Sequence, residues 1–300
     1  MIVRIKVPAT SANMGPGFDC LGVALGLYNV IETAETGGGL SITAAGSKGF
    51  ITGNENNLIY RAMMTVFEEC GYTPKGIRIF QRSRIPMTRG LGSSSACIIG
   101  GMLGANVIAG RQLSYDRILE LACKMEGHPD NVTPALYGGF CTAVREGERV
   151  YHTSTKLSGH IKFAVMIPGY YVATKRSRTV VPDSFSKADA VFNISHAAML
   201  VSALTSGKTE LLRIACEDRM HQQYRKEYIE GMEDIFRKSY ELGACAVYLS
   251  GSGPTILSVL DKNYSGFADG MNRFFKESFK DWKCRILTID NVGSVVSERP

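Results

Sequence analysis

Residues 86–96 (PMTRGLGSSSA) are of types that suit the binding of a phosphate group. Gly90 and Gly92 let the backbone turn sharply and let a ligand approach it closely. Three serines then begin an expected helix, whose first N–H groups lack intrahelical partners and lie at the positive end of the helix dipole. The segment lacks the lysine of a P-loop. Taken alone, it indicates a phosphate site or a serine cap on a tightly packed helix with equal weight.

A second polar group lies in residues 126–131 (EGHPDN), where Glu126, His128, Asp130 and Asn131 crowd together. These side chains offer a carboxylate for a metal ion, a hydrogen-bond donor and a group to lie near a reacting hydroxyl. Their spacing fits no zinc motif. Capping of a following helix by Asp130 or Asn131 explains the same residues equally well.

Residues 9–22 (ATSANMGPGFDCLG) form a stiff, glycine-containing loop after a strand. Asn13 and Asp19 are its polar members, and Asp19 has the apolar neighbours Phe18 and Leu21. A carboxylate in such surroundings needs a cation or hydrogen-bond donors, and the ammonium group of a substrate would serve. A capped turn is the alternative, and for this loop alone it is the favoured interpretation.

Residues 248–259 (YLSGSGPTILSV) place a glycine-rich turn between two apolar strands. Gly251, Ser252 and Gly253 therefore belong to a tight hairpin turn, or to a second glycine loop that closes on phosphate or substrate.

The elements that must position these groups indicate an α+β protein with largely antiparallel sheets, because strands and helices are mixed within each half of the chain. A length of 300 residues favours two domains. We expect domains at 1–157 and 158–300, with the glycine-serine loop in the first. The main expected strands are 2–7, 21–35, 76–83 and 161–168, and the main expected helices are 57–70, 94–109, 187–205, 209–219, 226–242 and 265–280.

Composition narrows the classes of function. Hydrophobic residues at 45% and charged residues at 21% are values of a globular protein. The net charge of +6 is too small and too scattered to indicate a nucleic-acid partner. We expect no signal peptide and no membrane-spanning helix, because no apolar run has the required length. The eight cysteines include no CxxC pair, which indicates free thiols in a reducing cytoplasm.

Together and in this order, the four segments resemble the GHMP kinase superfamily. PMTRGLGSSSA is similar to its ATP loop, and LSGSGPT is similar to its C-terminal glycine motif. Three further stretches, VPATSANMGPGFDCLG, EGHPDNV and YYVATKRSRTVVP, look like the homoserine kinase branch. The resemblance runs from end to end of the chain. It implies an N-terminal domain like domain 2 of ribosomal protein S5 and a ferredoxin-like C-terminal domain.

The resemblance also implies ATP, Mg²⁺ and phosphoryl transfer to the side-chain hydroxyl of L-homoserine. The product would be O-phospho-L-homoserine, a precursor of threonine. Members of this branch are cytoplasmic and often dimeric, so we expect a cytoplasmic homodimer.

By the same resemblance, each end of a zwitterionic substrate has a partner. Arg178 and Arg225 would hold the carboxylate, since a guanidinium matches a carboxylate in two-pronged fashion. Asp19 would hold the ammonium group. The remaining implied roles are substrate binding by Asn13, His128, Gly251, Ser252 and Gly253; catalysis by Asn131, Asp130, Thr174 and Glu126; substrate contact near the hydroxyl by Asn131 and Thr174; Mg²⁺ binding by Ser94 and Glu126; and nucleotide binding by Pro86, Met87, Thr88, Arg89, Gly90, Leu91, Gly92, Ser93, Ser94, Ser95 and Ala96.

Three alternatives stay open at this point. A mevalonate- or shikimate-type kinase would leave Asp19 without a cation to bind, because those acceptors lack an ammonium group. A sensor that binds nucleotide without turnover would be expected to lack Glu126 or the loop serines, and both are present. Either Asp130 or Asn131 could face the reacting hydroxyl, and we favour Asn131 because a loose transition state needs little help from a base.

Overall fold

The first sheet is the framework of the N-terminal half. The computed structural model describes residues 1–45, 53–172, 174–262 and 264–299. Along β1, Val3, Ile5 and Val7 are fully buried while Lys6 points to solvent, the alternation of a half-buried strand. The central strand order is β11-β1-β2-β4-β3, and only the β3–β4 pair is parallel among the described pairs. The strands are β1 (Ile2–Ala12), β2 (Leu21–Glu35), β3 (Gly39–Ala45), β4 (Gly76–Ser83), β5 (Phe140–Glu146), β6 (Arg149–Thr155) and β11 (Val295–Arg299).

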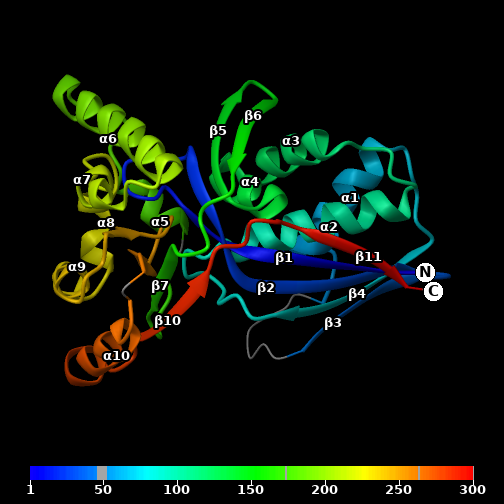
Figure 1. Ribbon diagram of the computed structural model, residues 1–300. Coiled ribbons are helices and arrows are strands. Elements are labelled where there is room, and N and C mark those ends of the chain that lie inside the picture. The colour runs from blue at the N-terminus through cyan, green and yellow to red at the C-terminus, as the bar shows by residue number, and fades with distance from the viewer. Residues whose placement is uncertain (46–52, 173, 263, 300) are drawn as a thin grey trace.

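Four helices cover this sheet, and α2 and α4 pack directly on β1 and β2 (Figure 1). Small residues allow the close approach of α2. A Cβ atom at Gly104, for example, would lie 2.7 Å from Oγ1 of Thr33 on β2. The helices are α1 (Leu58–Glu69), α2 (Ser93–Ile108), α3 (Tyr115–Glu126) and α4 (Pro129–Tyr137).

The second sheet is antiparallel, with the strand order β10-β7-β9-β8. This order, with helices between the first and second strands and between the third and fourth, is ferredoxin-like. The expected α+β class is thereby confirmed. The elements are β7 (Lys162–Ile167), α5 (Thr174–Thr179), α6 (Lys187–Ser206), η1 (Thr209–Leu211), α7 (Leu212–Ala215), α8 (Gln222–Arg225), η2 (Lys226–Tyr228), α9 (Met232–Glu241), β8 (Ala246–Leu249), β9 (Ile256–Leu260), α10 (Phe267–Ser278) and β10 (Lys283–Thr288).

Local patterns did not indicate three elements: β3, α5 and β11. β11 is five residues long and mostly polar, and its partner is β1 at the other end of the chain, with Ile2 opposite Arg299. The two termini therefore lie side by side (Figure 1). The boundary at 157/158 stays a prediction, and the last strand belongs to the first sheet.

Helix α6 has the length and the mean hydropathy, 1.2, of a helix that crosses a membrane. A core helix of a soluble protein passes the same test. In α6, Asn193 is buried, and its amide nitrogen donates to Asp218 at 2.8 Å and to the carbonyl of Pro16 at 3.3 Å. These bonds attach the helix to both parts of the fold.

Candidate active site

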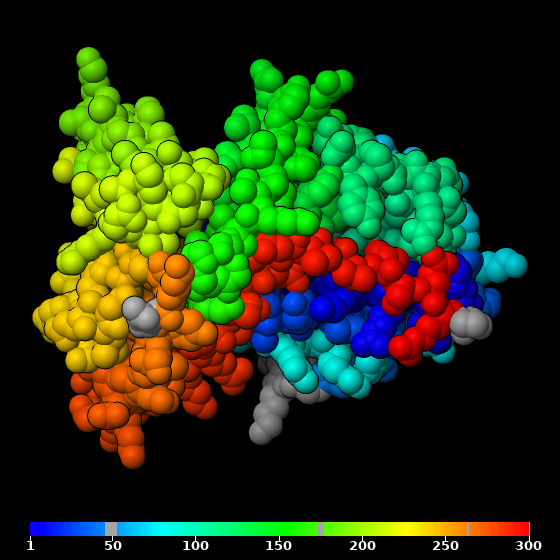
Figure 2. All heavy atoms as spheres, in the orientation of Figure 1, coloured from blue at the N-terminus to red at the C-terminus, as the bar shows by residue number. Residues whose placement is uncertain are grey.

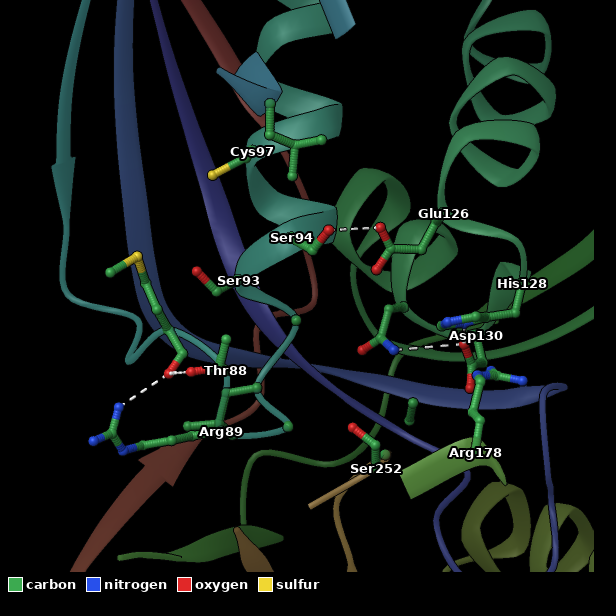
Figure 3. Close-up of a pocket in the computed structure, with 18 of the residues that line it drawn as sticks. Thr88, Arg89, Ser93, Ser94, Cys97, Glu126, His128, Asp130, Arg178 and Ser252 are labelled. Carbon is green, nitrogen blue, oxygen red and sulfur yellow. Dashed lines mark hydrogen bonds and ion pairs between the residues drawn. The ribbon is translucent and has the colours of Figure 1, made fainter. Parts of the chain in front are cut away.

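One cavity of about 350 Å³ gathers most of the predicted site (Figure 3). Its walls come from both halves of the chain. Of the predicted residues with described side chains, Pro86, Ser95, Ala96 and Gly253 do not line it, and the side chain of Thr174 lies outside the described part of the structure. The predicted residues that do line it are Asn13, Asp19, Met87, Thr88, Arg89, Gly90, Leu91, Gly92, Ser93, Ser94, Glu126, His128, Asp130, Asn131, Arg178, Arg225, Gly251 and Ser252.

The glycine-serine loop is shaped by glycine at its turn into α2. Gly92 is the N-cap of α2 with φ 65°, and a Cβ atom there would lie 1.9 Å from Oγ1 of Thr10. At Gly90, with φ 72°, a Cβ atom would lie 2.3 Å from the carbonyl oxygen of Ser250. No side chain among the described residues caps α2. Its first N–H groups are therefore left for an anion, and the serine cap considered above is wrong.

Three oxygen-bearing side chains meet beside this helix end. Glu126, the last residue of α3, accepts hydrogen bonds from the hydroxyl of Ser94 at 2.8 Å and from that of Ser95 at 3.0 Å. Figure 3 shows the Ser94–Glu126 contact at the cavity wall. Carboxylate and hydroxyl oxygens are the ligands that Mg²⁺ prefers, so the pair fits this ion.

A charged group closes the opposite end of the cavity. Arg178 on α5 forms a bidentate ion pair with Asp19, with N···O distances of 2.6 and 3.0 Å. Arg225 is only 1% exposed and donates to the carbonyls of Ser177 at 3.0 Å and Gly251 at 2.9 Å. Burial, together with the nearby charge of Arg178, lowers the pKa of Arg225 to about 10. Two guanidinium groups at one wall suit a carboxylate ligand.

Phe18 and His221 support these arginines, and neither was identified from the sequence. The ring of Phe18 lies 5.7 Å from the guanidinium carbon of Arg178 and 5.4 Å from that of Arg225. His221 is fully buried, accepts from Arg225 at 3.1 Å through Nδ1 and donates to the carbonyl of Gly15 at 2.8 Å through Nε2. Burial lowers the pKa of His221 despite the nearby carboxylate of Asp218, so the ring is neutral. The spacing of four residues between His221 and Arg225 was the available signal.

Both side chains left undecided by the sequence, Asp130 and Asn131, line the cavity from the first turn of α4. Asp130 pairs with Nδ1 of His128. Burial lowers the pKa of His128, but the hydrogen bond and charge of Asp130 outweigh it, and the net shift is upward. The amide oxygen of Asn131 accepts from Thr10 at 2.7 Å. That bond orients the Asn131 amide. Its nitrogen, Nδ2, then points toward Asp130 and lies 3.5 Å from Oδ1 of that residue.

The cavity extends past the loop to a part that no motif indicated. It is lined there by Leu58, Ile59 and Met87 together with Gln81 and Cys97. These residues come from α1, β4, α2 and the loop before it, and no local pattern joins them. Asn56 and Asn57 also line the cavity, so apolar and amide side chains are combined there, as suits the base of a nucleotide.

Comparisons with known proteins agree with this geometry. Residues 57–139 match the GHMP kinases N terminal domain, and residues 200–276 match the GHMP kinases C terminal domain. The homoserine kinase of Caldicellulosiruptor bescii is 46% identical over 98% of this chain and 97% of its own length. That of Clostridium beijerinckii is 44% identical over 99% of both chains. The crystal structure of homoserine kinase from Cytophaga hutchinsonii superposes with a TM-score of 0.87 at 25% identity, over 99% of this chain and 97% of the other. The chain therefore belongs to the homoserine kinase family of the GHMP kinases.

Proposed function

We propose that this protein transfers the γ-phosphoryl group of ATP to the side-chain hydroxyl of L-homoserine, giving O-phospho-L-homoserine for threonine biosynthesis. One observation carries the proposal. A single cavity of about 350 Å³ joins an uncapped helix end, suited to phosphate, to a carboxylate and two guanidinium groups, suited to a zwitterionic amino acid. The donor and the acceptor of a phosphoryl group would meet there.

At the nucleotide end, the N–H groups at the start of α2 would bind the phosphates of ATP. Ser94 and Glu126 would hold Mg²⁺, which when bound neutralises charge on the phosphate oxygens. The backbone of this loop is held in place from the C-terminal half, since the hydroxyl of Ser250 donates to the carbonyl of Gly90. Such fixed positioning supplies most of the catalysis in phosphoryl transfer.

At the amino-acid end, Arg225 and Arg178 would hold the substrate carboxylate and Asp19 its ammonium group, with Asn13 and His128 adding hydrogen bonds. Asn13 is already placed by its own bonds, because its amide nitrogen donates to the carbonyl of Gly251 at 3.1 Å. Ser252 and Gly253 of the same turn complete the proposed substrate loop.

Near the reacting hydroxyl, we assign orientation to Asn131 and keep Thr174 as a predicted neighbour. The Thr10 bond supports the role of Asn131, because it presents the amide N–H₂ group toward the cavity side of α4. Asp130 is engaged by His128, which argues for a structural and electrostatic part rather than that of a free base.

A coupled assay of ADP formation tests the proposal, with L-homoserine, (R)-mevalonate and shikimate as acceptors. We expect turnover with L-homoserine alone and a product identified as its O-phosphate by phosphorus NMR. Phosphorylation of mevalonate or shikimate instead of homoserine would establish a different GHMP kinase. Nucleotide binding without turnover of any acceptor would establish a sensor.

A homodimer in the cytoplasm belongs to the same proposal. Each of the eight cysteines is a free thiol, as in a reducing compartment. Helix α6 lies in the lobe at the upper left of Figure 2. Three of its apolar residues, Val191, Ile194 and Met199, are 57%, 71% and 43% exposed to solvent. No Lys, Arg, Asp or Glu follows Asp189 in this helix, which suits contact with a second copy of itself. Light scattering should give a dimer that Ile194→Lys dissociates, and a wild-type monomer would refute this contact.

A further inference from the structure

The Asp19–Arg178 ion pair occupies the groups that the substrate would need. Its two side chains are 33% and 38% exposed, so both remain within reach of a ligand in the cavity. They come from opposite halves of the chain, 159 residues apart. The hydrogen bond to Asp19 raises the pKa of Arg178, so the guanidinium keeps its charge. Figure 3 shows Arg178 rising into the cavity beside His128 and Asp130.

Arg225 is held differently, and the difference assigns separate roles to the two arginines. Its guanidinium donates to two backbone carbonyls and to His221, and it is almost fully buried. None of these partners is a carboxylate, so with respect to the residues that the structure describes Arg225 gives up no ion pair when it binds an anion. Arg178, in contrast, must exchange Asp19 for any anion that it binds in the same two-pronged way.

We propose that Asp19 and Arg178 form an exchangeable ion pair that makes this site selective for zwitterions. A ligand with both charges offers Asp19 an ammonium group and Arg178 a carboxylate, so each charge changes partner and none is left unpaired. A ligand with only a carboxylate takes Arg178 and leaves Asp19 without its ion-pair partner at the cavity wall. A ligand with only an ammonium group leaves Arg178 without an anion. The ion pair thus acts as an internal competitor against half-matched ligands.

This inference rests on the proposed amino-acid substrate. Two analogues, each lacking one of its charged groups, test the two ends of that substrate separately. 4-Hydroxybutanoate is homoserine without the ammonium group, and 3-amino-1-propanol is homoserine without the carboxylate. We would measure dissociation constants of all three ligands by ligand-observed NMR titration without nucleotide, for wild type, Asp19→Asn and Arg178→Gln.

In Asp19→Asn, we expect homoserine to bind about 10- to 100-fold more weakly, as for a lost hydrogen bond between charged groups. We expect 4-hydroxybutanoate to bind about 2- to 5-fold more tightly than to wild type, because Arg178 is freed from a half-exposed ion pair. Arg178→Gln should reverse the preference and tighten 3-amino-1-propanol by a similar factor while weakening homoserine. A loss of fold would weaken every ligand, so a gain for one analogue is a signature of exchange.

The Arg117–Glu69 pair supplies the matched control, because its side chains are each 34% exposed and come from α3 and α1, outside the cavity lining. Glu69→Gln should change no ligand affinity. The inference is overturned if Asp19→Asn binds 4-hydroxybutanoate no more tightly than wild type does, or if Glu69→Gln produces the same gain. Failure of the proposed function shows separately, as a wild-type protein that binds homoserine and both analogues but phosphorylates none of them.

Discussion

Replacement of Gly92 by alanine tests whether the loop before α2 is built for close contact. Gly92 has φ 65°, and the new Cβ atom would lie 1.9 Å from Oγ1 of Thr10 and 3.2 Å from Oδ1 of Asn131. Those two atoms are themselves hydrogen-bonded at 2.7 Å. The methyl group would therefore separate Thr10 from Asn131, the residue that we assign to the reacting hydroxyl.

The magnitude follows from two contributions. Alanine in a left-handed conformation costs about 1–2 kcal/mol, and the loss of a buried hydrogen bond costs about 1–2 kcal/mol more. We expect the free energy of unfolding to fall by about 2–4 kcal/mol. A shift of Asn131 by about 1 Å should lower kcat/KM for homoserine about 100-fold.

Gly110 provides the control, since its backbone is also in a left-handed conformation, with φ 88°, but a Cβ atom there would meet nothing within 4 Å. Gly110→Ala should therefore cost about 1–2 kcal/mol of stability and leave kcat/KM unchanged. Denaturant unfolding and the ADP-coupled assay would measure both variants. The reasoning fails if Gly92→Ala loses no more stability than Gly110→Ala and keeps its kcat/KM within about threefold.

Three further predictions concern single side chains. Asp130→Asn should keep much of kcat while Asn131→Ala loses more, because a loose transition state needs an oriented hydroxyl more than a base; a loss of about a thousandfold in a folded Asp130→Asn would reverse the assignment. Glu126→Gln should raise the Mg²⁺ concentration for half-maximal rate by about tenfold or more, and an unchanged Mg²⁺ requirement would remove Glu126 from the metal site. Burial lowers the pKa of His221 in the folded protein, so below about pH 6.5 the unfolded chain binds the extra proton and acid favours unfolding. Denaturant titrations between about pH 7 and pH 5 should therefore show a smaller loss of stability for His221→Gln than for wild type, and equal losses would show that His221 does not carry this dependence.

Much of the fold was predictable because its signals are local. Alternation in β1, the helical spacing of α1 and the glycine turn between β8 and β9 each depend on a few adjacent residues. β11 was not predicted because its five residues form a strand only by pairing with β1, at the other end of the chain. The helices expected at 209–219 and 226–242 are shorter in the structure. Gly231, with φ 68°, begins α9, and the carboxylate of Asp218 binds the N–H groups of residues 220–222 in place of a continued helix.

The amino-acid sequence by itself determined the parts of the site: a glycine-serine loop, an acidic and amide cluster, a loop carboxylate and two arginines, in an order typical of one kinase family. Tertiary structure alone decided how these parts engage. It paired Asp19 with Arg178 and held Arg225 by hydrogen bonds to backbone carbonyls and to His221. It also oriented the amide of Asn131 through a hydrogen bond from Thr10. The physical reason is that side-chain type depends on one position, whereas a hydrogen bond depends on the distance between two atoms, and here the partners are supplied by segments up to 159 residues apart.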